Sequence, residues 1–491
     1  MKIRVAAFIL TLLMFVAAAG CTTNKETDTD TSVPTASDIN EETTTDNTPV
    51  FPDADYDGAG FVVYARSSDA GSYKGMYIVS DNVVDTMSEA VYLRNLAVEE
   101  KYDVKISTME EDNPYEKIRA YLQSGDVPFD LVLDRRSYLG SLAQEGCFYN
   151  FNHLEHVDFT QKYWDANCAR DYEVAGKLFF MANDISVSNL AGARFFYFNK
   201  QLIADYNLED PYDLVHNNKW TLDKFLSMVQ SVSTDNGDGV WNAADTYGLL
   251  AEEGASNGNI MHLLVGCGIK FVEKNPDGTL TTNAYNEKTL DIMSKVASVL
   301  LNNNYSITYQ QASAGADTSN FANIYDYGRS LFTQDHFLFI QGNMGVAHQF
   351  KDMKSDYGVL PNPKYDEAQE SYYHKMDKYS LIWAIPNCNM DYERVGIIME
   401  YWAYQSSLTV MPAYYEITIK TKRVHEETAS QMLDLIKSTI LYDLSEPYGT
   451  NVASILYNGY TSGNLASSWS SNKKLIDKAL MDLYDKITSL D

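Results

Sequence analysis

The sequence predicts an α/β fold of two lobes with a helix-rich second half. Short apolar runs that fit buried strands alternate with helical segments between residues 61 and 133. This alternation favours parallel strands joined by right-handed crossovers. Helical periodicity dominates after residue 287. About 440 residues follow Val50, which is more than a single core usually holds, so we expect two lobes of ordinary domain size.

The first elements are placed by apolar periodicity and by turn residues. Residues 86–101 and 114–123 fit helices, and Pro114 suits the start of the second, where its missing N–H leaves no bond unmade. Apolar runs before and after these helices fit the strands of a parallel sheet. We therefore expect buried strands at 61–65, 104–107 and 129–133, and two further short strands at 177–182 and 194–199.

The second half carries clear helix and turn signals. Thr221 is a suitable N-cap, with Asp223 in the positive first turn. Trp220 is placed to pack on Phe225. The run Asn-Pro-Asp-Gly at 275–278 predicts a turn between two strands. We expect a hairpin of residues 269–273 and 279–282, and helices at 287–301, 392–404, 426–441 and 473–488.

The N-terminal segment indicates export and lipid attachment. Two cations precede an apolar run from Val5 to Ala19, a pattern typical of a signal peptide and too short for a membrane span. Small residues then precede Cys21, as in the bacterial lipobox. We expect residues 1–20 to be a lipoprotein signal peptide and Cys21 to carry lipid. The alternative is an ordinary cleaved signal. Residues 21–54 are acidic and Thr-rich, which predicts a disordered tether.

Charge and cysteine usage exclude several classes of partner. The chain has 67 acidic and 38 basic residues, a formal net charge of −29, and such a surface repels nucleic acid. It also lacks a basic membrane-binding character, so we expect the lipid to hold the protein at the membrane. No cysteine pair has zinc-ligand spacing. Export permits a Cys147–Cys168 disulfide, but we expect buried free thiols.

Nine segments within residues 55–450 together carry a family resemblance. They lie at residues 89–100, 129–133, 142–146, 177–180, 196–200, 219–225, 246–249, 356–361 and 414–420. In order and spacing they resemble the family 1 extracellular solute-binding proteins, the maltose-binding-protein-like group that serves ABC importers. The resemblance is to the Gram-positive lipoprotein members.

This resemblance implies a two-lobe fold of the type II periplasmic-binding-protein kind, with the ligand in the cleft. It implies chain crossings near residues 184–193, 379–385 and 414–420. Lobe 1 would then comprise residues 55–187 and 380–416, and lobe 2 residues 188–379 and 417–491.

Candidate ligand-binding residues follow from where the predicted strands end. Open α/β sheets bind ligands beyond the carboxyl ends of their strands, and charged or amide side chains stand there. Buried groups of this kind suit a ligand dense in hydroxyls. The candidates at strand ends are Arg66, Asp69, Asp134, Arg135 and Asp184, and near the crossings Trp383, Tyr414 and Tyr415 could offer flat faces.

In the second lobe, His348 is the candidate, because the turn 341–350 follows the apolar strand 337–340. The alternative roles are structural. Arg66, Asp69 and Asp134 could form intramolecular pairs or exposed loop charges, and Trp383 could pack in the core.

Three other motifs have alternative interpretations. Gly254–Gly258 fits G-x-S-x-G around Ser256, but two residues separate it from the preceding strand, unlike a hydrolase elbow. His153 and His156 have possible metal spacing, and we expect surface histidines instead. The loop 234–245 resembles a calcium loop with Asn236 and Asp238 as ligands. Because Thr234 replaces the first carboxylate, we expect it to bind no calcium.

The sequence thus predicts a lipid-anchored, monomeric solute-binding protein on the extracellular face of the cell membrane. It would capture a small hydrophilic solute, most readily a mono- or oligosaccharide, and pass it to ABC permease subunits. We expect no catalysis, cofactor or bound metal. The rival functions are a surface lipoprotein hydrolase that uses Ser256 or a carboxylate pair, and a glycan-tethering module without transport.

Overall fold

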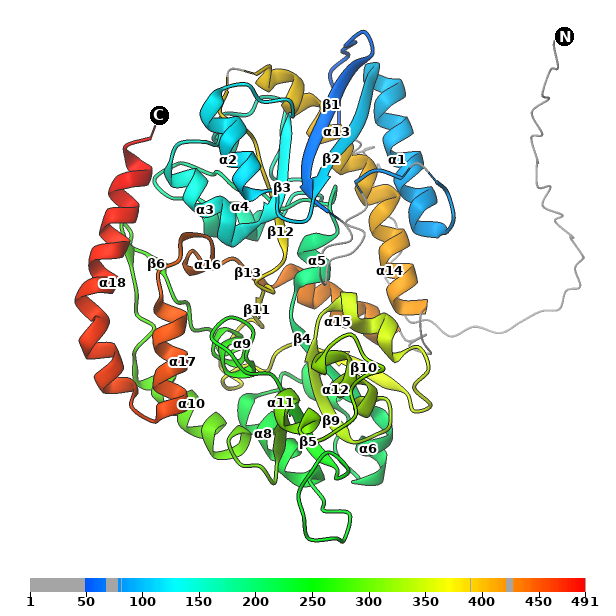
Figure 1. Cartoon of the computed structure of the whole chain (residues 1–491), viewed down its shortest axis with the longest axis vertical. Coiled ribbons are helices and arrows are strands. Elements are labelled where there is room, and N and C mark those ends of the chain that lie inside the picture. The colour runs from blue at the N-terminus through cyan, green and yellow to red at the C-terminus, as the bar shows by residue number, and fades with distance from the viewer. Residues whose placement is uncertain (1–48, 68–77, 81, 389, 421–426, 491) are drawn as a thin grey trace, which may run out of the picture. The chain divides into compact units, whose positions relative to one another are not determined.

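The computed structural model describes residues 49–67, 78–80, 82–388, 390–420 and 427–490. The chain divides into two units, residues 1–50 and 51–491. All the helices and strands described below lie in the second unit (Figure 1). The predicted signal peptide, Cys21 and most of the predicted tether lie outside the described residues, as does Asp69.

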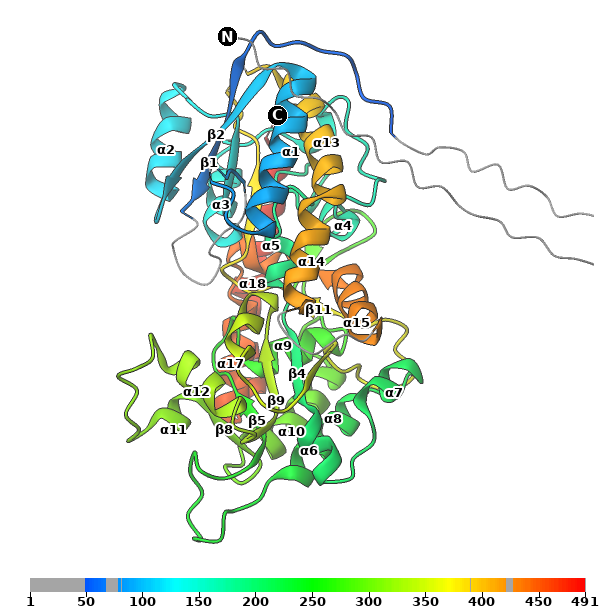
Figure 2. The same cartoon turned by 90° about the vertical axis from the view of Figure 1, so that its right-hand side faces the viewer.

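The first sheet has four strands in the order β12-β3-β1-β2. β1 pairs in parallel with β2 and β3, and β12 runs antiparallel to β3. Helices α1 and α13 lie side by side next to this sheet (Figure 2). The strands are β1 (Ala59–Arg66), β2 (Val104–Glu111), β3 (Leu131–Arg135) and β12 (Leu381–Ala384), and the helices around them are α1 (Thr86–Tyr102), α2 (Tyr115–Ser124), α3 (Arg136–Gln144), the short η1 (Phe151–His153), α4 (Ala166–Tyr172), α13 (Tyr392–Leu408) and α14 (Val410–Lys420).

The second sheet has five strands in the order β10-β4-β9-β5-β8. β5 is parallel to β8 and β9, whereas β4 is antiparallel to β9 and β10. The strands are β4 (Phe195–Asn199), β5 (Tyr247–Ala251), β8 (Ser306–Thr308), β9 (Phe337–Gly342) and β10 (Tyr357–Leu360). The helices of this part are α6 (Lys200–Asp205), α7 (Pro211–His216), α8 (Leu222–Val232), α9 (Asn259–Gly266), α10 (Glu287–Leu300), α11 (Tyr309–Ser313), α12 (Ile324–Phe332) and η2 (Met344–Phe350), and a hairpin is formed by β6 (Glu273–Lys274) and β7 (Leu280–Thr281).

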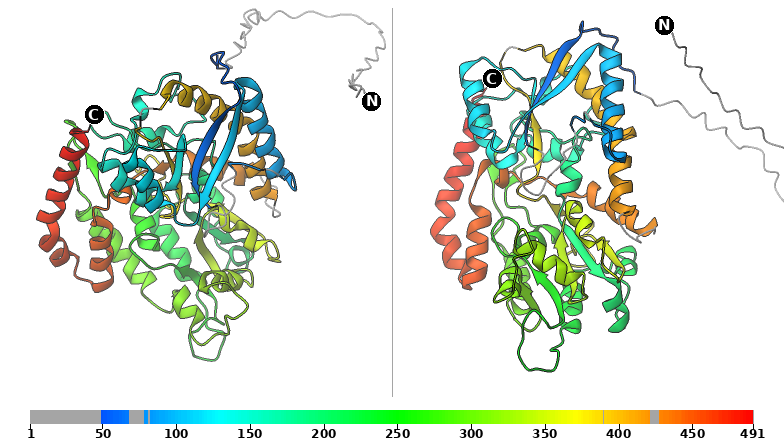
Figure 3. Two further views of the ribbon diagram at one scale, coloured as in Figure 1. Left: turned by 45° about the horizontal axis from the view of Figure 1, so that its top comes forward. Right: turned by 45° about the vertical axis from the view of Figure 1, so that its right-hand side comes forward.

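The chain passes between the two sheets more than once. α5 (Ser188–Gly192) lies on the first passage, and β11 (His374–Lys375) precedes the return to β12. β11 pairs in parallel with β13 (Ile440–Leu441). The chain ends with α15 (Glu427–Ser438), α16 (Ser445–Tyr448), α17 (Val452–Ser462) and α18 (Leu465–Thr488). Figure 3 shows α17 and α18 running beside each other at one side of the molecule.

Close backbone contact joins the C-terminal helices to the first sheet's part. A Cβ atom on Gly140 of α3 would lie 1.8 Å from the carbonyl oxygen of Pro447 in α16. No Cβ atom can lie that close to an oxygen. Because glycine has no Cβ, Gly140 permits α16 to pack directly on α3. This contact fixes the position of the residues at the start of α3, which matter for the site.

Most predicted elements are confirmed. Thr221 caps α8 by accepting a hydrogen bond from the Lys224 N–H, and the rings of Trp220 and Phe225 lie 5.9 Å apart between centroids. The hairpin forms as predicted. The four cysteines among the described residues are free. Of these thiols, Cys168 and Cys267 are buried and the other two are half-buried. Among the described residues, no helix combines the length and apolar composition that a membrane span requires.

Two element predictions are wrong. Residues 177–182 do not form a strand. Lys177 forms an isolated bridge with Val174, and Met181 forms one with Trp383 of β12. The segment therefore has no strand partner along its length. The third strand lies two residues further on than predicted, at Leu131–Arg135. As a consequence, Asp134 and Arg135 belong to the strand, and Asp184 does not follow a strand.

Candidate functional site

The carboxyl ends of β1 and β3 bring three charged side chains together. Arg66 ends β1, and Asp134 and Arg135 end β3. The Arg66 Nε donates to the Asp134 carboxylate at 2.6 Å, and both side chains are buried. Burial raises the pKa of Asp134, and the nearby Arg66 acts in the opposite direction. Two of the sequence candidates therefore form an intramolecular pair.

Arg135 has different surroundings. Its guanidinium lies over the rings of Tyr379 and Tyr138, at 4.6 and 5.8 Å from their centroids. Its Nε is buried and has no hydrogen-bond partner among the described residues. Arg135 also precedes α3 as its N-cap, and β12 begins opposite it with Leu381. The guanidinium is thus held in place by aromatic contacts and makes no hydrogen bond to a described residue.

A second group of charges stands at the corresponding edge of the second sheet. Arg194 directly precedes β4, whose first residue pairs with Gly342 at the end of β9, and Glu252 directly follows β5. Arg194 forms ion pairs with Glu252 and, at 3.3 Å, with Asp377. Gln341 in β9 accepts a hydrogen bond from Asn259 at 3.0 Å. Strand ends of both sheets therefore carry polar side chains.

Two tyrosines and an arginine continue this edge. Tyr309 follows β8, and its ring lies 4.9 Å from that of Tyr325 in α12. Arg329, one turn along α12, lies 6.0 Å from the Tyr325 ring and binds Asp326 at 3.2 Å. Burial raises the pKa of Tyr309 to about 12, and the Arg329 charge acts against this shift. Burial and Glu252 raise the pKa of Tyr325, so both phenols are neutral donors at ordinary pH.

Residues 377–379, the connecting segment that precedes β12, link the two groups. Asp377 binds Arg194 through its carboxylate, and its backbone carbonyl accepts from Arg136 of α3 at 2.8 Å. Tyr379 carries Arg135 on its ring, and Lys378 lies 4.7 Å from the same ring centroid. A continuous set of contacts therefore runs from β3 through the connecting segment to β4 and β5.

We call this set the strand-end site. Its members come from the ends of strands in both sheets, from α3 and α12, and from the connecting segment. Three of its tyrosines are among the exposed large side chains: Tyr138 and Tyr379 are each 36% exposed and Tyr325 is 39% exposed. The strand-end site comprises Arg66, Asp134, Arg135, Tyr138, Arg194, Glu252, Tyr309, Tyr325, Arg329, Gln341, Asp377, Lys378 and Tyr379.

The sequence candidates Asp184 and Tyr415 lie elsewhere, in the wall of a cavity of about 390 Å³. Asp184 forms an ion pair at 3.0 Å with Lys437 of α15. Burial raises the pKa of Asp184, and Lys437 acts in the opposite direction. Tyr415 lies in α14, so the third predicted crossing is helical. The cavity shares no residue with the strand-end site.

The remaining candidates are also dispersed. His348 is exposed in η2, where its Nδ1 lies 2.8 Å from the Gly345 carbonyl oxygen. Trp383 is 1% exposed and packs near Trp402, with 6.2 Å between ring centroids. Tyr414 is 9% exposed in α14. Of the candidates that the structure describes, only Arg66, Asp134 and Arg135 belong to the strand-end site, and a ligand contact by any of them stays a prediction.

The predicted calcium loop uses its oxygens to hold its own backbone. The Asp245 carboxylate accepts from the N–H groups of Asn236 and Asn242, at 2.9 and 2.7 Å. The Asn236 side chain in turn accepts from Asp238 N–H at 3.0 Å. Asn236 and Asp238 are exposed.

The G-x-S-x-G segment lies between β5 and α9. Ser256 accepts a hydrogen bond from Lys375 through its backbone carbonyl, at 2.9 Å. The nearest histidine along the chain, His262, is buried, and neither of its ring nitrogens has a hydrogen-bond partner among the described residues. The two residues thus form no serine–histidine pair of the kind that activates a serine nucleophile.

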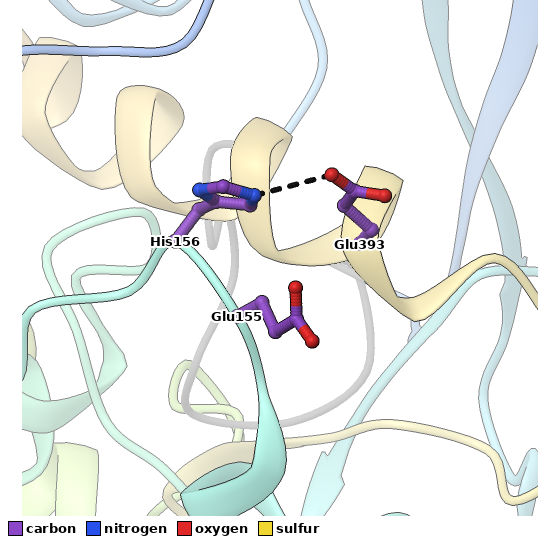
Figure 4. A group of neighbouring side chains, drawn as sticks. All are labelled: Glu155, His156 and Glu393. Atoms are coloured by element: carbon purple, nitrogen blue, oxygen red, sulfur yellow. Dashed lines mark hydrogen bonds and ion pairs between the residues drawn. The ribbon is translucent and has the colours of Figure 1, made fainter.

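One group of side chains has the composition of a metal site. Ligand atoms of Glu155, His156 and Glu393 lie within 4.8 Å of one another, and Figure 4 shows His156 bonded to Glu393, at 3.2 Å. All three residues are exposed, and His153 does not belong to the group. Exposed side chains of this kind are ordinary at a surface, as predicted for the two histidines, and nothing else at this place points to a ligand.

Sequence reasoning missed most of the second sheet's contribution. Glu252 directly follows a strand, so the strand-end argument that selected Arg66 could have found it, whereas Arg194 begins the predicted strand 194–199 and an argument about carboxyl ends does not reach it. Tyr325 and Arg329 lie on a helix that the periodicity did not single out. Tyr138, Lys378 and Tyr379 carry no motif, and only the folded chain brings them to the strand ends.

Comparison with solved structures confirms the predicted two-lobe α/β fold. A cyclic α-maltosyl-1,6-maltose binding protein from Arthrobacter globiformis is 12% identical and superposes with a TM-score of 0.56 over 87% of this chain and 100% of that one. A cyclo/maltodextrin-binding protein complexed with maltotetraose is 14% identical, with a TM-score of 0.53 over 88% of this chain and 97% of that one. An ABC substrate-binding protein from Listeria monocytogenes in complex with cycloalternan is 11% identical, with a TM-score of 0.51 over 88% and 98%. No protein-family model and no curated protein matches the sequence. The predicted resemblance therefore holds at the level of the fold.

Proposed function

We propose that this protein binds a saccharide in the strand-end site and delivers it to an ABC permease. The observation that supports this most is that polar side chains and exposed tyrosines from both sheets meet through the connecting segment Asp377–Tyr379. Strand ends are where open α/β sheets bind their ligands. The solved structures with this fold include proteins complexed with maltotetraose and with cycloalternan.

The chemistry of the site suits a molecule rich in hydroxyl groups. Several buried donors have no partner among the described residues, including Arg66 Nη2, Arg329 Nε and Gln341 Nε2. Buried donors without partners are unfavourable, so a ligand that accepts from them gains affinity. The partly exposed rings of Tyr138 and Tyr325 can pack against the flat faces of sugar rings while their hydroxyls stay hydrated.

Through the connecting segment, ligand binding can favour one arrangement of the two sheets over another. Residues from both sheets contact Asp377–Tyr379, so a ligand held between them would favour whichever arrangement brings both sets of side chains onto it. This preference can shift the equilibrium only by the difference in affinity between the two arrangements. The protein's role in transport would then be capture and delivery, with the energy supplied by the permease's own ATPase.

We further propose that lipid on Cys21 anchors the protein at the extracellular face of the membrane. The support is the signal-like segment, the small residues before Cys21 and the acidic Thr-rich stretch after it. Replacing Cys21 with Ala should move the protein from the membrane fraction to the medium. Unchanged membrane retention would contradict this part of the proposal. We expect the protein to act as a monomer.

The proposed binding is tested by screening saccharides against the purified full chain with thermal denaturation and calorimetry. One saccharide class should raise the melting temperature, because a ligand that binds only the folded state stabilises it. The saccharide should be recovered unchanged. Release of a product from a glycan or ester substrate, lost in Ser256→Ala, would support the hydrolase instead. Binding to polymeric glycan but to no short saccharide would support a tethering module.

A further inference from the structure

The charges of the strand-end site are not balanced one for one. Its three acidic side chains all form ion pairs, Asp134 with Arg66 and both Glu252 and Asp377 with Arg194, and Arg329 pairs with Asp326, which lies next to the site. Five cations thus face four carboxylates, and two of the cations, Arg135 and Lys378, form no ion pair with any described residue. In a chain of net charge −29, the candidate binding site thus carries a surplus of one positive charge.

These two cations contact the same aromatic ring. Both contact the Tyr379 ring, Arg135 at 4.6 Å and Lys378 at 4.7 Å from its centroid. Apart from ring contacts, neither the guanidinium nor the ammonium group makes a hydrogen bond to a described residue. Both residues are half-buried. Like charges at one ring and partly out of water repel, and an anion that contacts both would relieve that repulsion.

The polar atoms without hydrogen-bond partners also favour an anionic ligand. Among the members of the strand-end site other than Arg194, these are four donor groups, Arg66 Nη2, Arg135 Nε, Arg329 Nε and Gln341 Nε2, one acceptor, Asp134 Oδ2, and the Tyr309 hydroxyl, which can do both. A neutral sugar hydroxyl both donates and accepts, so it gains no special advantage from a surplus of donors. A carboxylate only accepts, and its two oxygens fit the paired N–H groups along one edge of a guanidinium.

We propose that the solute is an acidic carbohydrate, a saccharide with a uronic-acid residue, whose carboxylate is bound by Arg135 and Lys378. This inference rests on the proposed function, because it names the class of saccharide that the same site takes. The Arg135 guanidinium receives the two carboxylate oxygens, and the Lys378 ammonium supplies the second charge. The tyrosines and the remaining donors hold the sugar rings. The cationic pair also gives an acidic solute a local attraction that the acidic surface otherwise lacks.

The test compares short uronate saccharides with their carboxyl-reduced counterparts, which keep the same sugar stereochemistry but lack the charge. Oligogalacturonates, oligoguluronates and glucuronate-bearing xylo-oligosaccharides are titrated by calorimetry into the purified full chain. One acidic saccharide should bind, and its reduced counterpart should bind about 10- to 100-fold more weakly, the range for a charged hydrogen bond. Raising the salt concentration should weaken only the acidic ligand.

Two variants locate the carboxylate. Arg135→Gln and Lys378→Gln should each weaken binding of the acidic saccharide about tenfold or more and leave the weak binding of its reduced counterpart unchanged. Lys478→Gln is the matched control, because Lys478 lies on α18 in a surface pair with Asp482, and it should change neither affinity. Melting curves of all three variants check that the fold is kept.

The outcomes separate this inference from the proposed function. Tight binding of a neutral saccharide, with affinity unchanged in Arg135→Gln and Lys378→Gln, would overturn the acidic solute but keep the saccharide-binding role. Tight binding of a sulfated saccharide and of no uronate would overturn the carboxylate. Failure of every saccharide, neutral or acidic, to bind the natural chain would overturn both.

Discussion

Arg135 and Arg136 are neighbours in sequence, yet the structure gives them opposite surroundings. Arg136 is 2% exposed and donates to the Tyr172 hydroxyl at 3.1 Å, to the Asp377 carbonyl at 2.8 Å and to Glu446 at 3.4 Å. Within the part of the chain that the structure describes, the Arg135 guanidinium has only ring contacts. Lys375 and Lys378 repeat the contrast, since buried Lys375 binds Glu446 and the Ser256 carbonyl, whereas among the described residues the Lys378 ammonium contacts only the Tyr379 ring.

This contrast distinguishes charges that hold the fold from charges that can hold a ligand. Arg136, Lys375 and Glu446 form a buried ion cluster between α3, β11 and α16. Burial alone would raise the pKa of Glu446, but Lys375 and Arg136 more than reverse that effect and the pKa is lowered. The partners of Glu446 in this cluster, Arg136 and Lys375, belong to the same chain. Arg135 and Lys378 lie one and three residues away and form no ion pair with a described residue, although the charge of Arg135 acts on Asp134 and that of Lys378 on Glu446.

The largest expected effect comes from breaking the buried cluster. Glu446→Gln removes the negative charge that faces both Arg136 and Lys375, and leaves two buried cations unpaired. We expect the free energy of unfolding to fall by about 3–5 kcal/mol, as for other buried pairs that lose one partner. Denaturant titration measures it, and Arg135→Gln is the matched control, with a change within about 0.5 kcal/mol. Equal destabilisation by both variants would remove the distinction between the two groups.

A smaller effect on the free energy of unfolding should come from pH, through the buried residue His374. Burial lowers the pKa of His374, next to Lys375, to about 3, and its Nε2 accepts from the Asn362 N–H at 3.1 Å. The neutral ring stabilises the folded state fully above pH 6.5, and this contribution is lost as pH falls toward 3, where the folded state is protonated too. His374→Gln should therefore be less stable than the natural chain at pH 7, with a difference that narrows on acidification. A difference independent of pH would contradict the assignment.

The smallest effect is expected at the loop 234–245, where Asp238 is exposed and Asp245 is buried. Its Asp and Asn oxygens accept from the loop's own backbone N–H groups, and Thr234 supplies no carboxylate at the first position. Calorimetry with micromolar calcium should give no measurable binding. Saturation at micromolar calcium, lost in Asp238→Ala, would show that the loop is a working metal site.

The same contrast explains which parts of the fold and the site can be predicted from the sequence. Apolar periodicity and capping residues predicted strands and helices on both sheets, and the strand-end argument selected Arg66, Asp134 and Arg135. This argument could not predict that Asp134 pairs with Arg66 while Arg135 forms no ion pair with a described residue, because that depends on which side chains face the core. Lys378 and Tyr379 reach the site through a connection between two sheets, and nothing local in the sequence marks such a place.

The false prediction at 177–182 has a similar cause. An apolar run that is buried looks like a strand in the sequence, but a strand also needs a partner along its length, and this segment finds one only at single residues. Asp184 was assigned to the ligand because of that expected strand. In the folded chain it pairs with Lys437, a residue 253 positions away.

The central claim is that one site takes a saccharide with residues of both sheets. The most direct test is calorimetric titration of the best-binding saccharide into the natural chain, Tyr138→Ala and Tyr325→Ala. The first tyrosine stands beside the first sheet and the second beside the second sheet. Each loss should weaken binding about tenfold, the size expected for one aromatic contact, with melting temperatures unchanged. Full affinity in both variants would place the binding site elsewhere and contradict the account.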